Sequence, residues 1–241
     1  MSTYSVHTEN LEKRFGTFQA VKDINLAVQE GEIFGFLGAN GAGKTTAIRM
    51  LCGLLLPSGG TGTVAGFDIW KENEKIKRNI GYMSQKFSLY NDLTLAENIE
   101  FYAGVYGLDR ATLTAKRKRL LEELELTDKA DRMTRDMPLG FKQRLALGCA
   151  LLHDPQIIFL DEPTGGVDPE ARRNFWELIY TLADEGKTVF VTTHYMDEAE
   201  YCNRVSIMYE GQIVALDSPE TLKRKYGKSS MQEVFIHLVD K

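Results

Sequence analysis

Hydrophobic and polar positions follow two different patterns along this chain of 241 residues. Short apolar runs bounded by turn residues recur before residue 86 and after residue 156, and such runs predict β-strands. From about residue 87 to residue 155 no strand pattern occurs, and apolar residues return at helical spacing among mixed charges. We therefore expect an α/β core at residues 1–86 and 156–220, a helical lobe inserted at 87–155, and a helical tail at 221–241.

The strand predictions rest on short runs of apolar or β-branched residues. Residues 11–37 as a whole predict strands, and a turn at 29–31 leads into the apolar run 33–37. Four consecutive apolar residues at 157–160 predict a strand buried on both faces, as in a parallel sheet. Further strands are predicted at 63–65, 80–85 and 188–192, and a closing hairpin at 204–209 and 212–216.

The helix predictions rest on capping residues as well as on spacing. Thr94 and Glu97 form a capping-box pattern that opens a helix through about Val105. Asp168 followed by Pro169 supplies the N-cap and first-turn residues of another helix, which ends before residue 186. The other predicted helices span residues 46–52, 111–125, 141–152 and the tail from residue 231, whose apolar face we expect to pack on its own domain.

Composition narrows the possible functions. The net charge is −5 and no basic stripe occurs, which argues against a nucleic-acid groove; the basic residues 116–119 predict a solvated helix face. No apolar run approaches the ~20 residues that span a bilayer, and residues 1–10 lack the core of a signal peptide. Cys52, Cys149 and Cys202 lie far apart without metal-ligand spacing, which predicts reduced core thiols in a cytosolic protein.

A glycine-rich stretch between a predicted strand and a predicted helix is the strongest chemical signal. Glycines let backbone N–H groups approach phosphate oxygens, and the helix N-terminus adds the positive end of a dipole. Lys44 can reach the β- and γ-phosphates, and the Thr45 hydroxyl can bind Mg²⁺. The predicted phosphate-binding residues are Gly38, Ala39, Asn40, Gly41, Ala42, Gly43, Lys44, Thr45 and Thr46.

Two acids directly after the apolar run 157–160 form a second candidate centre. Open α/β sheets bind ligands at the carboxyl ends of their strands, where Asp161 and Glu162 stand. We expect Asp161 to face a Mg²⁺ site and Glu162 to point at an attacking water. The structural alternative is a pair of acids that only caps the strand.

Three further residues carry weaker signals. Gln85 ends a predicted strand and can offer an oxygen to a cation and an NH₂ group to a water. His194 follows another predicted strand, where a lone histidine is usually structural, but the two predicted strands before it also end in candidate site residues, Gln85 and Asp161, which favours a functional role. Phe15 stands in a polar neighbourhood and can stack on an adenine ring, although packing in the core explains it equally well.

Together these motifs resemble the nucleotide-binding subunit of an ABC transporter, over about residues 4–240. The resemblance implies a P-loop NTPase (RecA-like) α/β core with an antiparallel β subdomain and an inserted all-helical lobe, and it implies ATP and Mg²⁺ as ligands. Within the family, residues 83–90 and 233–236 are similar to subunits of drug, lipid or polysaccharide exporters.

Carried over residue by residue, the resemblance assigns a role to each motif. Phe15 would stack on adenine, residues 38–46 would be the Walker A motif, and Gln85 the Q-loop glutamine. Residues 166–168 would form the D-loop. The implied catalytic residues are Lys44, Glu162 and His194, and the implied metal ligands are Thr45, Gln85 and Asp161.

One motif departs from the family pattern. The signature L-S-G-G-Q precedes the last helix of the lobe and caps the ATP bound by the opposite subunit, whereas residues 137–141 here read MPLGF. Pro138 has neither a hydroxyl nor a backbone N–H, so two usual phosphate donors are absent. Gly140 remains the residue expected to contact ATP in trans, backed by a helix N-terminus. The run PLGFKQR at 138–144 resembles one branch of exporter ATPases.

The resemblance also implies partners. Two copies, or this chain and a similar one, would close head to tail over two ATP molecules. The chain would be a peripheral protein on the cytoplasmic face of the inner or plasma membrane, bound to transmembrane permease subunits and to no nucleic acid. Two other functions stay open: a non-transport ABC ATPase switch, and a regulatory half that binds ATP with low turnover because Pro138 and Leu139 alter the signature.

Overall fold

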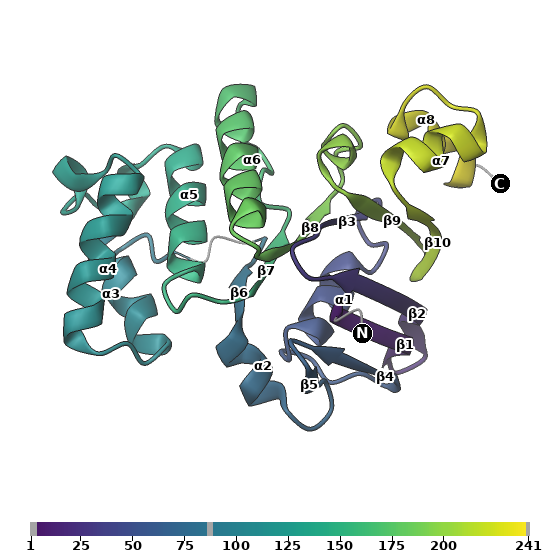
Figure 1. The fold of residues 1–241 in the computed structure, drawn as a ribbon, viewed down its shortest axis with the longest axis horizontal. Coiled ribbons are helices and arrows are strands. Elements are labelled where there is room, and N and C mark those ends of the chain that lie inside the picture. The colour runs from purple at the N-terminus through teal and green to yellow at the C-terminus, as the bar shows by residue number, and fades with distance from the viewer. Residues whose placement is uncertain (1–3, 86–88, 240–241) are drawn as a thin grey trace.

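The computed structural model describes residues 4–85 and 89–239. Two β-sheets lie side by side, helices cover them, and a group of helices projects to one side (Figure 1). The larger sheet has six strands in the order β10-β9-β3-β8-β7-β6. Its strands are β3 (Ile33–Leu37), β6 (Ile80–Met83), β7 (Ile157–Asp161), β8 (Thr188–Thr193), β9 (Arg204–Tyr209) and β10 (Gln212–Asp217).

All strands of the larger sheet are parallel except β10, which pairs antiparallel with β9. Every residue of β3, β7 and β8 is buried, as the continuous apolar run at 157–160 predicts. Because these three strands are neighbours that run in the same direction, their carboxyl ends meet at one edge of the sheet. The residues that follow them are therefore brought together.

The smaller sheet is antiparallel and has the order β2-β1-β4-β5. Its strands are β1 (Tyr4–Phe15), β2 (Phe18–Gln29), β4 (Gly59–Val64) and β5 (Phe67–Asp68). One hydrophobic cluster joins this sheet to helix α1 (Lys44–Leu51) and to the larger sheet, with Phe34, Phe159 and Phe190 fully buried in it. Phe190 contacts both other rings at centroid distances of 5.2 and 5.3 Å.

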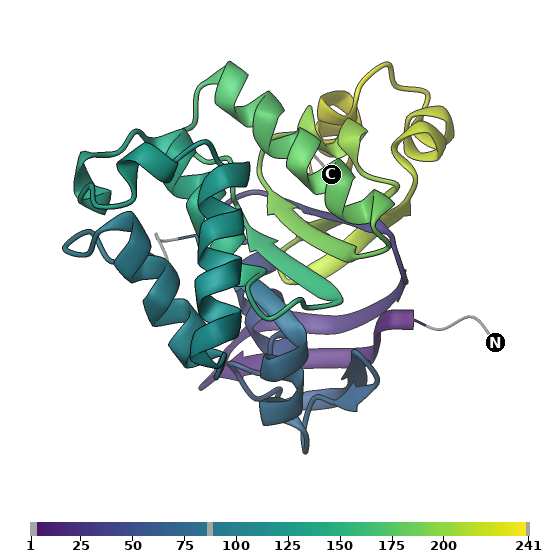
Figure 2. The same ribbon diagram turned by 60° about the vertical axis from the view of Figure 1, so that its left-hand side comes forward.

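The helical lobe contains α3 (Leu95–Val105), α4 (Arg110–Glu123) and α5 (Leu139–Ala150), with two 3-10 turns, η1 (Thr127–Lys129) and η2 (Thr134–Asp136). The predicted capping box at α3 is confirmed, because Thr94 and Glu97 each bond the backbone N–H of the other. The lobe packs through α5 on α6 (Pro169–Asp184), which covers the larger sheet (Figure 2).

The C-terminal part forms the helices α7 (Pro219–Tyr226) and α8 (Met231–Val239). Met231 and Val234 are buried in the same hydrophobic cluster as the larger sheet, so the tail packs on its own chain as expected. None of the helices within residues 4–85 and 89–239 combines the length and the hydrophobicity needed to span a membrane.

Some predicted boundaries were wrong. The strand predicted at 63–65 begins at Gly59 because that residue pairs with Glu12 of β1. The strand predicted at 80–85 ends at Met83, so Gln85 lies beyond it. Helix α5 begins two residues earlier than predicted, with Pro138 as its N-cap. Helix α2 (Asn73–Asn79) and the 3-10 helix η3 (Glu198–Tyr201) were not predicted.

Candidate functional site

The loop between β3 and α1 is shaped by glycines at positive φ. Gly41 has φ 82°, and Gly43 has φ 105°. A Cβ atom on Gly43 would lie 2.5 Å from the carbonyl oxygen of Ala20, so only glycine fits against that backbone. The loop is thus held against neighbouring strands while its N–H groups precede the start of α1, the geometry of an anion-binding site.

Lys44 is the first residue of α1 and is almost completely buried. Its ammonium donates to the carbonyl oxygens of Gly38 and Ala39 at 2.8 and 3.2 Å. The same ammonium lies 3.2 Å from Oε1 of Glu162, whose side chain is also shielded from solvent. The lysine charge is therefore held directly over the glycine loop.

Asp161 ends β7 and offers one free carboxylate oxygen. Its Oδ1 accepts hydrogen bonds from the hydroxyls of Thr192 at 2.7 Å and Thr45 at 3.3 Å. Its Oδ2 is buried and accepts none from the described residues. Burial raises the pKa of Asp161, and the bonds from Thr192 and Thr45 oppose that rise. A buried acid with an unsatisfied oxygen suits a cation.

The side chains present fit Mg²⁺, which the family expectation implies. Mg²⁺ prefers oxygen donors and usually binds one or two carboxylates together with substrate phosphates. The free Oδ2 of Asp161 and the nearby Thr45 hydroxyl are donors of this kind. Among residues 4–85 and 89–239, no cluster of three or more His, Cys, Asp or Glu side chains could hold a metal without such help.

Glu162 is the centre on which the other candidate residues converge. Its Oε2 accepts from Nε2 of Gln85 at 2.9 Å and contacts Nδ1 of His194 at 3.1 Å, while its Oε1 contacts Lys44. Its backbone adopts φ 50°, a left-handed conformation that is uncommon outside glycine. The structure thus brings together residues that follow β3, β6, β7 and β8.

The remaining candidates lie at the edges of this centre. Phe15 ends β1 with half of its surface exposed, so the core-packing alternative is wrong, and its contact with adenine stays a prediction. Gly140 lies in the first turn of α5, where an added Cβ would approach the Cβ of Ala171 on α6 to 2.8 Å. Gln85 contacts Glu162 through its amide nitrogen, so its metal-binding oxygen also stays a prediction.

Sequence reasoning missed Thr192. Its hydroxyl donates to Asp161, and both its hydroxyl and its carbonyl oxygen accept from the backbone N–H of Glu162. It therefore orients both acids. A signal was present, because Thr192 stands at the carboxyl end of a predicted strand, where open α/β sheets place ligand-binding residues.

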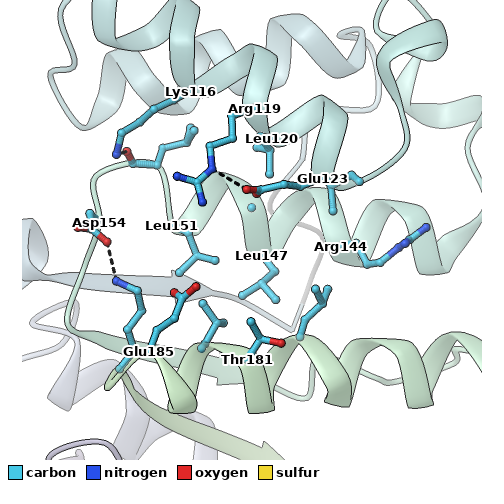
Figure 3. A pocket seen from close by; sticks show the side chains of 16 residues that line it. Lys116, Arg119, Leu120, Glu123, Arg144, Leu147, Leu151, Asp154, Thr181 and Glu185 are labelled. Atoms are coloured by element: carbon cyan, nitrogen blue, oxygen red, sulfur yellow. Dashed lines mark hydrogen bonds and ion pairs between the residues drawn. The ribbon is translucent and has the colours of Figure 1, made fainter.

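A cavity of about 640 Å³ lies elsewhere, between α4, α5 and α6 (Figure 3). Leucines such as Leu147 and Leu151 line it, and the ion pair between Asp154 and Lys187 stands at its rim. It includes none of the predicted site residues. It lies where the lobe meets the helix that covers the larger sheet.

Comparison with known proteins identifies the family. A profile of the ABC transporter family matches residues 21–165. The chain belongs to the ABC transporter family. The family resemblance read from its motifs is therefore confirmed.

Similar curated proteins carry names that refer to a multidrug transporter or to linearmycin resistance. The "Probable multidrug ABC transporter ATP-binding protein YbhF" of Escherichia coli (strain K12) is 47% identical over 239 residues, which is 97% of the ABC chain and 41% of that protein. The chain thus spans less than half of that relative. The "Linearmycin resistance ATP-binding protein LnrL" of Bacillus subtilis (strain 168) is 36% identical, over 96% of the chain and 75% of that protein.

Solved structures agree with the fold. An ATP-binding subunit of an ABC transporter superposes with a TM-score of 0.86 at 27% identity, covering 98% of this chain and 99% of that one. A dimeric ATP-binding cassette in a post-hydrolysis state, bound to ADP and Pi, superposes with a TM-score of 0.80 at 27% identity, covering 88% and 98%. The predicted P-loop NTPase fold of the ABC chain is confirmed.

Proposed function

We propose that this ABC ATPase powers an exporter by hydrolysing ATP between two nucleotide-binding subunits. The observation that carries the proposal is the convergence of Lys44, Asp161, Glu162 and His194 at one edge of the parallel sheet. The names of the relatives support export of a drug-like cargo rather than a non-transport switch. The presence of both Glu162 and His194 in contact argues against a regulatory half with low turnover.

ATP would bind with its phosphates on the glycine loop. Lys44 would turn from Glu162 to the β- and γ-phosphates, and the exposed ring of Phe15 would stack on adenine. Thr45 and Asp161, together with the amide oxygen of Gln85, would hold Mg²⁺, which supplies positive charge beside the phosphates. Releasing Glu162 from Lys44 also frees its carboxylate to face a water.

Hydrolysis then needs positioning and a proton acceptor. A water oxygen forms a bond to the γ-phosphorus, and the bond from that phosphorus to the bridging oxygen of ADP breaks. Glu162 polarises the water and accepts its proton, while His194, 3.1 Å from Glu162, contacts the γ-phosphate. The products are ADP and inorganic phosphate.

A second nucleotide-binding subunit would complete each site. Its α5 N-terminus, with Gly140 in the first turn, would cap the triphosphate across the interface. Pro138 removes two donors there, and a hydrogen bond to a charged group contributes about 1.5–3 kcal/mol, so the helix dipole must provide more of the attraction. The dimeric neighbour with ADP and Pi supports this arrangement.

Permease subunits would bind beside Gln85, at the junction of core and lobe. A hollow of about 840 Å³ is lined by Ser84, the residue before Gln85, and by apolar and aromatic residues that include Leu54, Tyr82, Val105 and Tyr106. Leu54 and Val105 are more than half exposed and both line this hollow, so they offer apolar surface to a partner. Docking there would place the chain peripherally on the cytoplasmic face of a membrane and would let a shift at Gln85 reach the permease.

The decisive test is the ATPase activity of the purified chain with Glu162→Gln. We expect turnover to fall roughly a hundredfold or more while ATP binding persists, because the amide keeps the shape but accepts no proton. Unchanged turnover would remove Glu162 from the catalytic role. Specific activity of the natural sequence should also rise with protein concentration, and a flat profile through the monomer range would contradict the shared-site arrangement.

A further inference from the structure

A second buried acid, Glu198, lies beside the site without belonging to it. It is the first residue of η3, four residues after His194, and its side chain is fully buried. Oε1 accepts a hydrogen bond from the Thr164 hydroxyl at 2.5 Å, and Oε2 is buried without a hydrogen bond from the described residues. Burying a carboxylate costs free energy that an apolar side chain of similar volume would avoid. Filling space does not by itself explain why a carboxylate is buried at this position.

Glu198 connects two segments that carry the chemistry. Thr164 comes two residues after Glu162, and the turn between them is closed by the bond from the Gly165 N–H to the Glu162 carbonyl. The bond between Thr164 and Glu198 thus ties the loop behind Glu162 to the segment behind His194. These two segments otherwise leave the ends of separate strands, β7 and β8.

Arg172 closes the connection from the other side. Its Nε lies 3.7 Å from Oε1 of Glu198, and its guanidinium stacks over the ring of Tyr195 at 4.2 Å. The ring of Tyr195 in turn lies 4.2 Å from the ring of His194. Arg172 is in the first turn of α6, bonded through its backbone to Asp168 of the D-loop motif. One network therefore joins His194, the loop behind Glu162 and the start of α6.

We propose that Glu198 is a positioning residue for ATP hydrolysis, which holds His194 and Glu162 at their working separation through Tyr195, Arg172 and Thr164. This inference rests on the roles proposed above for Glu162 and His194. Because misplacing a reacting group by about 1 Å can cost a large factor in rate, the effect should appear in kcat and not in nucleotide affinity.

The test replaces the buried polar pair by apolar side chains of similar size, Thr164→Val with Glu198→Met. Such replacements often preserve stability, so the thermal unfolding temperature should stay near that of the natural sequence. We expect kcat to fall roughly tenfold or more while the Kd for ADP changes by less than about twofold. The single change Thr164→Ser keeps the hydroxyl and should leave kcat near that of the natural sequence. Glu200→Gln is the matched control, because Glu200 lies in the same 3-10 helix but is exposed and paired with Lys223.

Each outcome of this test supports or overturns the positioning role of Glu198. A folded double variant with normal kcat would overturn the positioning role. If the double variant does not fold, equal kcat for the single changes Thr164→Val and Thr164→Ser would overturn it instead. Full activity in Glu162→Gln would defeat the proposed function itself, whereas an inactive Glu162→Gln beside a fully active Thr164→Val would defeat only the role of Glu198.

Discussion

The ion pair between Lys44 and Glu162 competes with nucleotide binding. Nζ and Oε1 are 3.2 Å apart, and the two side chains expose only 4% and 8% of their surface. To bind, a phosphate must replace the Glu162 carboxylate as the partner of the Lys44 ammonium. We therefore expect Glu162→Gln to bind ADP more tightly than the natural sequence, in addition to its slower turnover.

The magnitude follows from the geometry. Two unit charges 3.2 Å apart attract by about 5 kcal/mol at an effective dielectric constant of about 20. Most of this is offset by the cost of removing both groups from water, and hydrogen bonds to charged groups contribute about 1.5–3 kcal/mol net. Glutamine can still accept from Lys44, so we assign about 1 kcal/mol to the lost charge, which corresponds to about fivefold tighter binding.

Isothermal titration with ADP measures this without interference from hydrolysis. The matched control is Glu170→Gln, which removes an exposed acid from the first turn of α6 and should leave the ADP affinity unchanged. Equal or weaker binding of ADP by Glu162→Gln would refute the reasoning. A similar gain in both variants would attribute the effect to overall charge instead of to the contact with Lys44.

Three further predictions address the signature, the sheet and the pH dependence. Pro138→Ser should supply the side-chain cap that α5 lacks and raise the free energy of unfolding by about 1 kcal/mol in thermal unfolding. It should also strengthen ATP-dependent dimers in sedimentation, and weaker dimers would contradict this. Arg204→Met breaks two hydrogen bonds to the buried carboxylate of Glu32, at 2.6 and 2.9 Å, and should cost about 2–4 kcal/mol in urea unfolding; a loss below about 1 kcal/mol would contradict it. Burial lowers the pKa of His153, so the unfolded chain binds its proton more readily and the free energy of unfolding falls as the pH drops below about 6.5. His153→Phe keeps a ring against Tyr106, so its unfolding temperature should fall less between about pH 7.5 and about pH 5.5 than that of the natural sequence. An unchanged dependence of the unfolding temperature on pH would refute this.

The parts of the fold that depend on local rules could be predicted from the sequence. Thr94 and Glu97 satisfy each other within one turn, so the start of α3 was correct to the residue. Asp161 was identified because open α/β sheets bind ligands at the carboxyl ends of their strands, a property of topology, whereas the catalytic role of His194 was implied by the family resemblance. Helix α7 also had a local signal that was overlooked, since Ser218 caps it and Pro219 is its first residue.

Contacts made across the fold could not be predicted. The sequence does not indicate that Glu162 contacts Lys44, because the left-handed backbone at Glu162 depends on the surrounding packing. Thr164 and Glu198 are separated by 34 positions, and each is an ordinary residue in its own segment. Helix α2 buries one side chain, Ile76, so its spacing gives almost no amphipathic signal.

The attachment of the helical lobe limits how it can move. The chain leaves the sheet after Met83 at the end of β6 and returns at Ile157, where the neighbouring strand β7 begins; Ile157 pairs with Ile80. The two connections are therefore separated by the length of β6, roughly 10 Å for three steps of ~3.3 Å. Between these connections the lobe shares one hydrophobic cluster with α6 and the larger sheet. Any displacement of the lobe therefore has to rearrange apolar packing against α6, which links its position to the core through buried side chains as well as through the chain.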